Sequence, residues 1–146
     1  MSTQYTHILL ATDLLDDNSI VVERAQLLAR QNDARLSLIH AVESIPIYFG
    51  NEMVLPETQE IEAQLLDRAE KKMAELVGKL TVEGVDTHVV VGITKLEVIS
   101  YAEQQGVDLI VIGSHSRHGL GHLLGSTARS VLNAAPCDVM AVKIKT

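Results

Sequence analysis

The stretch that decides the fold is Leu109-Ile-Val-Ile-Gly-Ser-His-Ser116, in which a short apolar run ends in glycine and hydroxyl side chains. Four other short apolar runs lie at residues 8–11, 36–42, 88–91 and 139–144. Runs of this length that are rich in β-branched residues are typical of buried strands. We therefore predict five strands, of which the fourth leads into a glycine-rich segment.

Helical periodicity fills the intervals between these runs. Apolar residues recur at helical spacing within residues 18–31, 58–80 and 128–135. Thr94-Lys-Leu-Glu97 has the form of a capping box and predicts a further helix, which Gly106 should end. Residues 43–57 form the one long stretch without a pattern, and we predict an irregular loop there.

Strands and helices alternate along the whole chain, which favours an α/β fold. The pattern predicts a five-stranded parallel sheet with helices on both faces, a Rossmann-like arrangement. Two strand orders, 3-2-1-4-5 and 2-1-3-4-5, are the commonest solutions for such a sheet. The length of 146 residues fits a single domain over residues 1–146.

Composition limits the partners and the compartment. The net charge of −7 argues against nucleic acid and anionic membranes as partners. Cys137 is the one cysteine, so no intramolecular disulfide can form, and we interpret it as a small buried hydrophobic residue. The chain shows neither a signal-peptide pattern nor an apolar run of about 18 residues, and we expect a cytoplasmic protein.

Ligands of open parallel sheets bind outside the carboxyl ends of the strands, where the strand order reverses. In the order 3-2-1-4-5 this point lies between the first and fourth strands. The first strand ends in Ala11, Thr12 and Asp13, and the fourth ends at Gly113. The sequence therefore predicts a ligand site at these two strand ends.

The segment after the fourth strand suits a phosphate group. Gly125, Ser126 and Thr127 open the last helix, whose free N–H groups and partial positive charge favour an anion, and Arg117 could add charge. The alternative is that the glycines and Ser126 only turn the chain and cap the helix. Neither a P-loop nor a G-x-G-x-x-G motif is present.

Five stretches, at residues 7–13, 36–42, 107–115, 123–128 and 137–142, together resemble the universal stress protein family over nearly the full chain. The resemblance implies strand order 3-2-1-4-5. It also implies a homodimer through antiparallel pairing of the last strands, here residues 138–144. The nucleotide-binding branch of the family carries G-x2-G-x9-G-[S/T], whereas this chain has Gly113-x2-Ser116-x8-Gly125-Ser126. Ser116 could crowd the phosphates through its Cβ or donate to them through its hydroxyl.

The resemblance also assigns roles around the nucleoside. It places Ala11, Thr12 and Asp13 beside the nucleoside and Ala41 against the adenine. Asp13 would accept from ribose hydroxyls or reach a divalent ion such as Mg²⁺. The alternative for Asp13 is a cap on the first helix.

Three hypotheses for function follow. The first is a dimeric stress-response regulator that binds ATP, ADP or AMP and is not an enzyme beyond slow ATPase activity, because no catalytic arrangement is visible. The second is an interaction module of the same fold without a nucleotide. The third is an adenylating enzyme, but this chain has no catalytic signature of such enzymes at the end of its first strand.

The histidines do not change these hypotheses. His115, His118 and His122 would share a face only on a continuous helix, which Gly119 and Gly121 oppose, so we expect no metal site. We interpret His40 as a hydrogen-bonded core residue and His88 as a strand surface residue.

Overall fold

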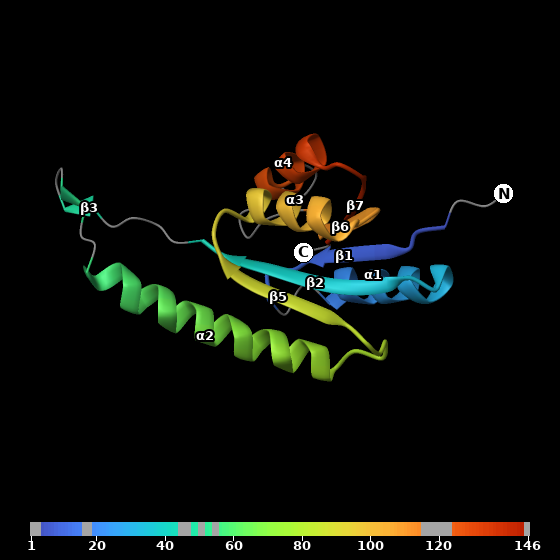
Figure 1. Ribbon diagram of the computed structural model, residues 1–146, viewed down its shortest axis with the longest axis horizontal. Helices are drawn as coiled ribbons and strands as arrows, with labels where there is room; N and C mark the ends of the chain where they lie inside the picture. Colours follow the sequence, from blue (N-terminus) through green and yellow to red (C-terminus); the bar gives the residue numbers. More distant parts are fainter. Residues whose placement is uncertain are drawn as a thin grey trace.

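The computed structural model describes residues 4–15, 19–43, 48–49, 52–53, 56–114 and 124–144, with side chains in 4–15, 19–43, 60–114 and 124–144. Figure 1 shows its strands and helices alternating along the chain. Their bounds are β1 His7–Ala11, α1 Ser19–Asn32, β2 Arg35–Val42, β3 Tyr48–Phe49, β4 Glu52–Met53, α2 Pro56–Gly78, β5 Asp86–Val91, α3 Thr94–Gln105, β6 Leu109–Gly113, α4 Ser126–Ala134 and β7 Asp138–Val142.

The main sheet has five parallel strands in the order β5-β2-β1-β6-β7. Counted among these five strands alone, the order is 3-2-1-4-5, so this prediction is confirmed and the order 2-1-3-4-5 is wrong. The order reverses between β1 and β6, where Leu10 pairs with Val111.

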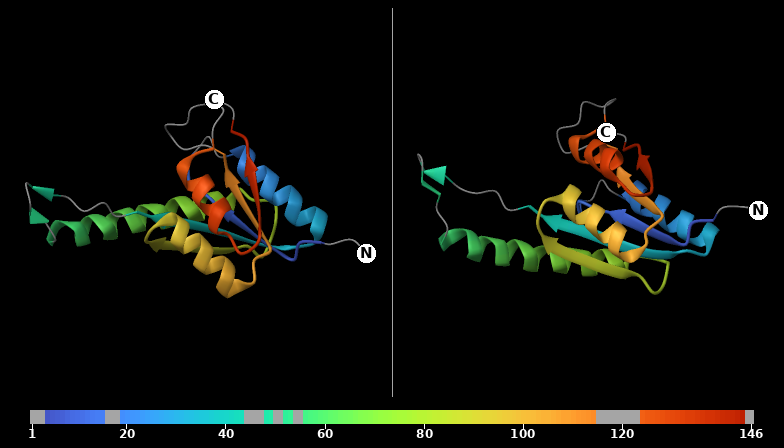
Figure 2. Two further views of the ribbon diagram at one scale, coloured as in Figure 1. Left: turned by 90° about the horizontal axis from the view of Figure 1, so that it is seen from above. Right: turned by 45° about the horizontal axis from the view of Figure 1, so that its top comes forward.

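Helices cover both faces of the sheet (Figures 1 and 2), as predicted. Alternate residues of β1 point to opposite sides, as the pleat requires. Ile8 and Leu10 pack in a cluster with residues of α1 and α2. Leu9 and Ala11 pack in a second cluster with residues of α3 and α4. Two aliphatic cores, one on each face, therefore hold the sheet.

The described residues of the stretch 43–57 include two short strands and the start of a helix, which were not predicted. β3 and β4 pair antiparallel within it. α2 begins at Pro56 rather than at residue 58, and proline is favoured at a first helical position. The first turns of α2 extend beyond the sheet (Figure 1). Because of this overhang, Ile61 on the predicted apolar stripe is 41% exposed, whereas Met73 lower on the helix is 2% exposed.

The predicted capping box is wrong. Thr94 is the first residue of α3, and Ile93 is the N-cap without a side-chain cap bond. The Thr94 N–H donates instead to the Glu43 carboxylate at 2.9 Å. A residue just after β2 thus satisfies the helix end, which local sequence could not indicate. Gly106 does end the helix in the left-handed conformation, with φ 66°.

The last strand is shorter than predicted. β7 ends at Val142. Beyond it, the Ile144 N–H donates to the Ser114 hydroxyl at 3.1 Å. This hydrogen bond holds the segment after β7 beside the residue that follows β6.

No helix in the described ranges combines the length and the apolar character needed to cross a membrane.

Candidate functional site

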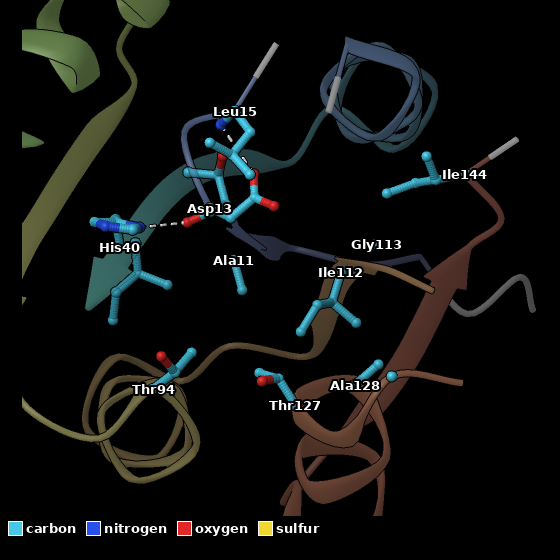
Figure 3. Close-up of a pocket in the computed structure, with 13 residues that line it drawn as sticks. Ala11, Asp13, Leu15, His40, Thr94, Ile112, Gly113, Thr127, Ala128 and Ile144 are labelled. Atoms are coloured by element: carbon cyan, nitrogen blue, oxygen red, sulfur yellow. Dashed lines mark hydrogen bonds between the residues drawn. The ribbon is translucent and has the colours of Figure 1, made fainter. Parts of the chain in front are cut away.

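A pocket of about 230 Å³ lies at the carboxyl ends of β1 and β6, where the strand order reverses. Figure 3 shows Asp13 and His40 on one side of it, and Thr127 and Ala128 of α4 on another. Its lining comes from β1, β2, β6, α3, α4 and the segments that follow β1 and β7. The residues are Ala11, Thr12, Asp13, Leu15, Ile39, His40, Thr94, Ile112, Gly113, Gly125, Thr127, Ala128 and Ile144. The pocket thus occupies the position predicted for a ligand.

The chain turns sharply after β1, and side chains hold this turn. The Thr12 hydroxyl accepts from the Leu14 N–H at 3.0 Å, and the Asp13 carboxylate accepts from the Leu15 N–H at 2.9 Å. Leu14 has φ 62°, a conformation that costs energy for a non-glycine residue. α1 begins only at Ser19, so Asp13 is not its N-cap, and that interpretation is wrong.

The start of α4 is open to the pocket. Gly125 is the N-cap, with φ −62° and ψ 158°, and the helix has no side-chain cap bond there. The first helical bond runs from the Arg129 N–H to the Gly125 carbonyl at 3.0 Å. The N–H groups of residues 126–128 precede this bond and have no acceptor within the helix. Thr127 and Ala128 line the pocket, so this helix end can receive an anion.

The ends of the segment between β6 and α4 meet at the pocket. The Gly125 N–H donates to the Ser114 carbonyl at 2.7 Å, and the Ser114 N–H donates to the Val142 carbonyl at 2.8 Å. Ser116 and Arg117, both predicted site residues, lie outside the described residues. The same holds for His115, His118 and His122. The predictions for these residues therefore remain untested.

Sequence reasoning missed His40 as a pocket residue. Its Nδ1 lies 2.7 Å from the Thr12 carbonyl oxygen. Since a carbonyl only accepts, Nδ1 carries the hydrogen. The predicted hydrogen bond is present, but the ring is half-buried and lines the pocket. Ile39 pairs with Ala11, so His40 lies one residue beyond the level at which β1 ends. The predicted strand order places the second strand beside the first, and this neighbourhood could have indicated His40 as a site residue.

Other predicted site residues divide into two groups. Ala11, Thr12, Asp13, Gly113, Gly125 and Thr127 come together around the pocket. Ala41 and Ser126 are not among its lining residues; Ala41 is buried in β2 and Ser126 begins α4.

The described lining of the pocket carries little charge. Asp13 and His40 are the ionisable side chains among its described lining residues. Within the described residues, no group of three histidine, cysteine or acidic side chains could hold a metal ion. Cys137 packs against the α3–α4 side of the core, where burial raises the pKa of its thiol. A raised pKa disfavours the reactive thiolate.

The fold and this pocket define a doubly wound α/β protein with a cavity at its topological switch point. The chain belongs to the universal stress protein family, which it matches over residues 4–143. It is 43% identical to universal stress protein A homolog 2 of Coxiella burnetii, with 97% of each chain covered. It is 39% identical to homolog 1 of that organism, with 97% of this chain and 98% of the relative covered.

Solved structures agree with this assignment. Universal stress protein UspA from Lactobacillus plantarum superposes with a TM-score of 0.76 at 26% identity, covering 99% of this chain and all of that one. The protein MJ0577 superposes with a TM-score of 0.79 at 25% identity, covering 99% of both chains. A universal stress protein in complex with cAMP shares the fold, with a TM-score of 0.63 at 24% identity over 98% of this chain and 100% of that one.

Proposed function

We propose that this chain binds an adenine nucleotide (ATP, ADP or AMP) in the switch-point pocket and acts as a cytoplasmic stress-response regulator rather than as an enzyme. One observation carries the proposal. The Asp13 carboxylate and the uncapped N-terminus of α4 border the same cavity, so a ligand with hydroxyls at one end and phosphates at the other would meet suitable groups at both.

Electrostatics orients the ligand in this proposal. Phosphates go to the N–H groups at the start of α4 and to the Thr127 hydroxyl, because the Asp13 carboxylate would repel them. Asp13 accepts from the ribose hydroxyls or holds Mg²⁺ that accompanies the phosphates. The adenine lies toward Ile39 and His40, on the β2 side, next to Ala41. Ser116 and Arg117 would complete the phosphate end.

The family relation supports this choice of ligand. The solved relative described as a cAMP complex holds an adenine nucleotide on the same fold. The described pocket, at about 230 Å³, is smaller than the roughly 300–1,000 Å³ usual for ligand sites. Gly113 and Gly125, on either side of the segment that carries Ser116 and Arg117, both line this pocket.

Calorimetric titration and thermal-shift measurements with ATP, ADP and AMP, each with and without Mg²⁺, test the proposal. We expect saturable heat and a raised melting temperature with at least one nucleotide. The absence of both binding heat and a melting-temperature shift with all three nucleotides would reject the proposal. Asp13→Asn should weaken binding while keeping the oxygen that accepts from Leu15, and Asp33→Asn, in a left-handed position that asparagine tolerates, is the matched control.

A nucleotide-free interaction module is the second candidate, and Ser116 with its shortened spacer favours it. In that case partner binding would survive a substitution that blocks the pocket.

We also propose a homodimer through residues 138–144. β7 is an edge strand of the sheet, and such edges favour pairing with another strand. Sedimentation of Ala141→Lys, an exposed position in β7, should show more monomer than the parent protein at equal concentration. An unchanged distribution would exclude this interface.

A further inference from the structure

A second and larger cavity lies on the opposite face of the sheet from α3 and α4. It is a groove of about 630 Å³ between α1 and α2, a volume usual for small-molecule sites. Residues of both helices pack in the core cluster on that face and line the groove. The groove is lined by Thr12, Leu14, Leu15, Ser19, Val22, Glu23, Gln26, Arg30, Lys72, Glu75, Leu76, Lys79, Leu80 and Thr81.

The inner wall of the groove is apolar. Val22 of α1 is buried, and Leu14, Leu76 and Leu80 pack against the same core cluster while still lining the groove. These side chains come from the turn after β1, from α1 and from the end of α2. An apolar molecule placed along them would remove both surfaces from water.

Hydrogen bonds hold one end of the groove in shape. The Gln26 side chain is 8% exposed, and its oxygen accepts from the Thr81 N–H at 2.8 Å and from the Thr81 hydroxyl at 3.1 Å. Arg30 Nη1 lies 2.7 Å from the same hydroxyl oxygen. These bonds tie α1 to the chain that follows α2, so this end of the site is formed before a ligand arrives.

The same end carries positive charge from Arg30 and Lys79, while Glu23 and Glu75 line other parts of the groove. Arg30 lies near the end of α1 and Lys79 directly follows α2, and both line the groove. Within the described residues neither forms an ion pair; the pairs there are Arg35–Asp86 and Lys71–Asp67. Glu75 lies one helical turn from Lys79, and Glu23 lies two turns from Arg30. In a chain of net charge −7, two cations at the end of an apolar groove favour an anionic head group there.

We propose that the α1–α2 groove binds a free single-chain amphiphilic anion, an apolar tail that ends in one carboxylate, sulfonate or phosphate. The tail lies against Val22, Leu76 and Leu80, and the head group lies between Arg30 and Lys79. This site is separate from the proposed nucleotide site. The two cavities share Thr12 and Leu15, so the turn after β1 forms a wall of each.

Fluorescence titration with 1-anilinonaphthalene-8-sulfonate, an aromatic sulfonate, tests the proposal. We expect saturable binding that decanoate, used below its micelle concentration, displaces and that decyltrimethylammonium displaces far less. The double variant Arg30→Gln/Lys79→Gln should bind decanoate about tenfold more weakly. The matched control is Arg24→Gln/Lys71→Gln, which removes the same charge from exposed positions of α1 and α2 outside the groove.

Several results would overturn this inference. They are absence of displacement by decanoate, equal weakening in the control variant, equal displacement by the cationic amphiphile, and binding to phosphatidylglycerol vesicles without binding to monomeric decanoate. Displacement of the probe by ATP in competition would assign the probe to the other pocket and also overturn the inference. Thermal melts establish that each variant is folded, and amide chemical shifts of α1 and α2 on decanoate addition provide a second readout. Failure of nucleotide binding would leave every one of these results unchanged.

Discussion

The two ends of the sheet contain histidine and aspartate side chains in different surroundings. At the amino end, His7, Ser37 and Asp108 are engaged in a closed set of hydrogen bonds. At the carboxyl end, Asp13 and His40 border a pocket. The comparison shows that residue type alone does not mark a site; whether a cavity adjoins the polar groups does.

The amino end shows a serine and a histidine that cannot act on a substrate. His7 Nε2 lies 2.7 Å from the Ser37 hydroxyl oxygen, and His7 Nδ1 lies 3.1 Å from the Gln105 carbonyl oxygen, to which it donates. Ser37 is fully buried and His7 is 4% exposed. This pair is therefore structural and fixes the start of β1 against β2 and α3.

Asp108 completes this end. Its carboxylate accepts from the Thr6 N–H at 2.8 Å and from the His7 N–H at 3.0 Å. Burial alone would raise the pKa of Asp108, but these bonds and one from the Thr6 hydroxyl outweigh burial and lower the pKa. At the carboxyl end, by contrast, the first N–H groups of α4 have no acceptor within the helix.

The largest expected effect comes from filling the pocket. Gly125→Val should weaken nucleotide binding about 100-fold or more, which is about 2.7 kcal/mol, since its side chain would enter the phosphate end. The backbone at Gly125 has φ −62° and ψ 158°, which valine adopts freely, so the melting temperature should change little. Calorimetric titration measures the affinity. The control is Gly78→Val at the last residue of α2, where an added Cβ would have no heavy atom within 4 Å. Unchanged affinity would place the nucleotide elsewhere.

The next effect concerns the amino end. Ser37→Ala should lower the free energy of unfolding by about 2 kcal/mol, because it leaves buried His7 Nε2 without its hydrogen-bond donor. Nucleotide affinity should stay the same. Urea denaturation measures the loss, with Ser100→Ala, at a half-buried hydroxyl on α3, as the control. A change in nucleotide affinity without a change in the free energy of unfolding would contradict a purely structural role for the His7–Ser37 pair.

Asp108→Ala should have a smaller effect on stability. We expect a loss of about 1 kcal/mol, since three hydrogen bonds disappear but solvent reaches the carboxylate and reduces their net value. Asp86→Ala breaks only an exposed ion pair with Arg35 and should cost less. Equal losses in the two variants, measured by urea denaturation, would contradict the role of Asp108 at this end.

The smallest effect is a dependence on pH. Because the folded pKa of Asp108 is lowered, its contribution to stability is complete above the unfolded carboxyl pKa of about 3.9 and is lost as the pH falls through the folded value. The parent protein should therefore lose more stability than Asp108→Asn between about pH 5 and pH 3. Parallel melting curves of the two proteins over this range would show that another carboxylate is responsible.

Much of the fold follows from local pattern. The five apolar runs predicted the five strands of the main sheet, and Gly106 marked a helix end that the structure confirms. These features depend on short-range physics: a buried strand needs an apolar run, and a left-handed helix end favours glycine. The site at the ends of β1 and β6 followed from the same pattern once the strand order was inferred from the family resemblance.

By itself the sequence determined where the chain is apolar, where it turns and which strand ends are polar, since these properties reside in neighbouring residues. Only the tertiary structure decided that Glu43 satisfies the start of α3, that His40 faces the pocket, and that Arg30 and Lys79 share a groove. Each of these depends on two segments far apart in the chain. Their meeting is set by how helices pack on the sheet, which no local spacing records.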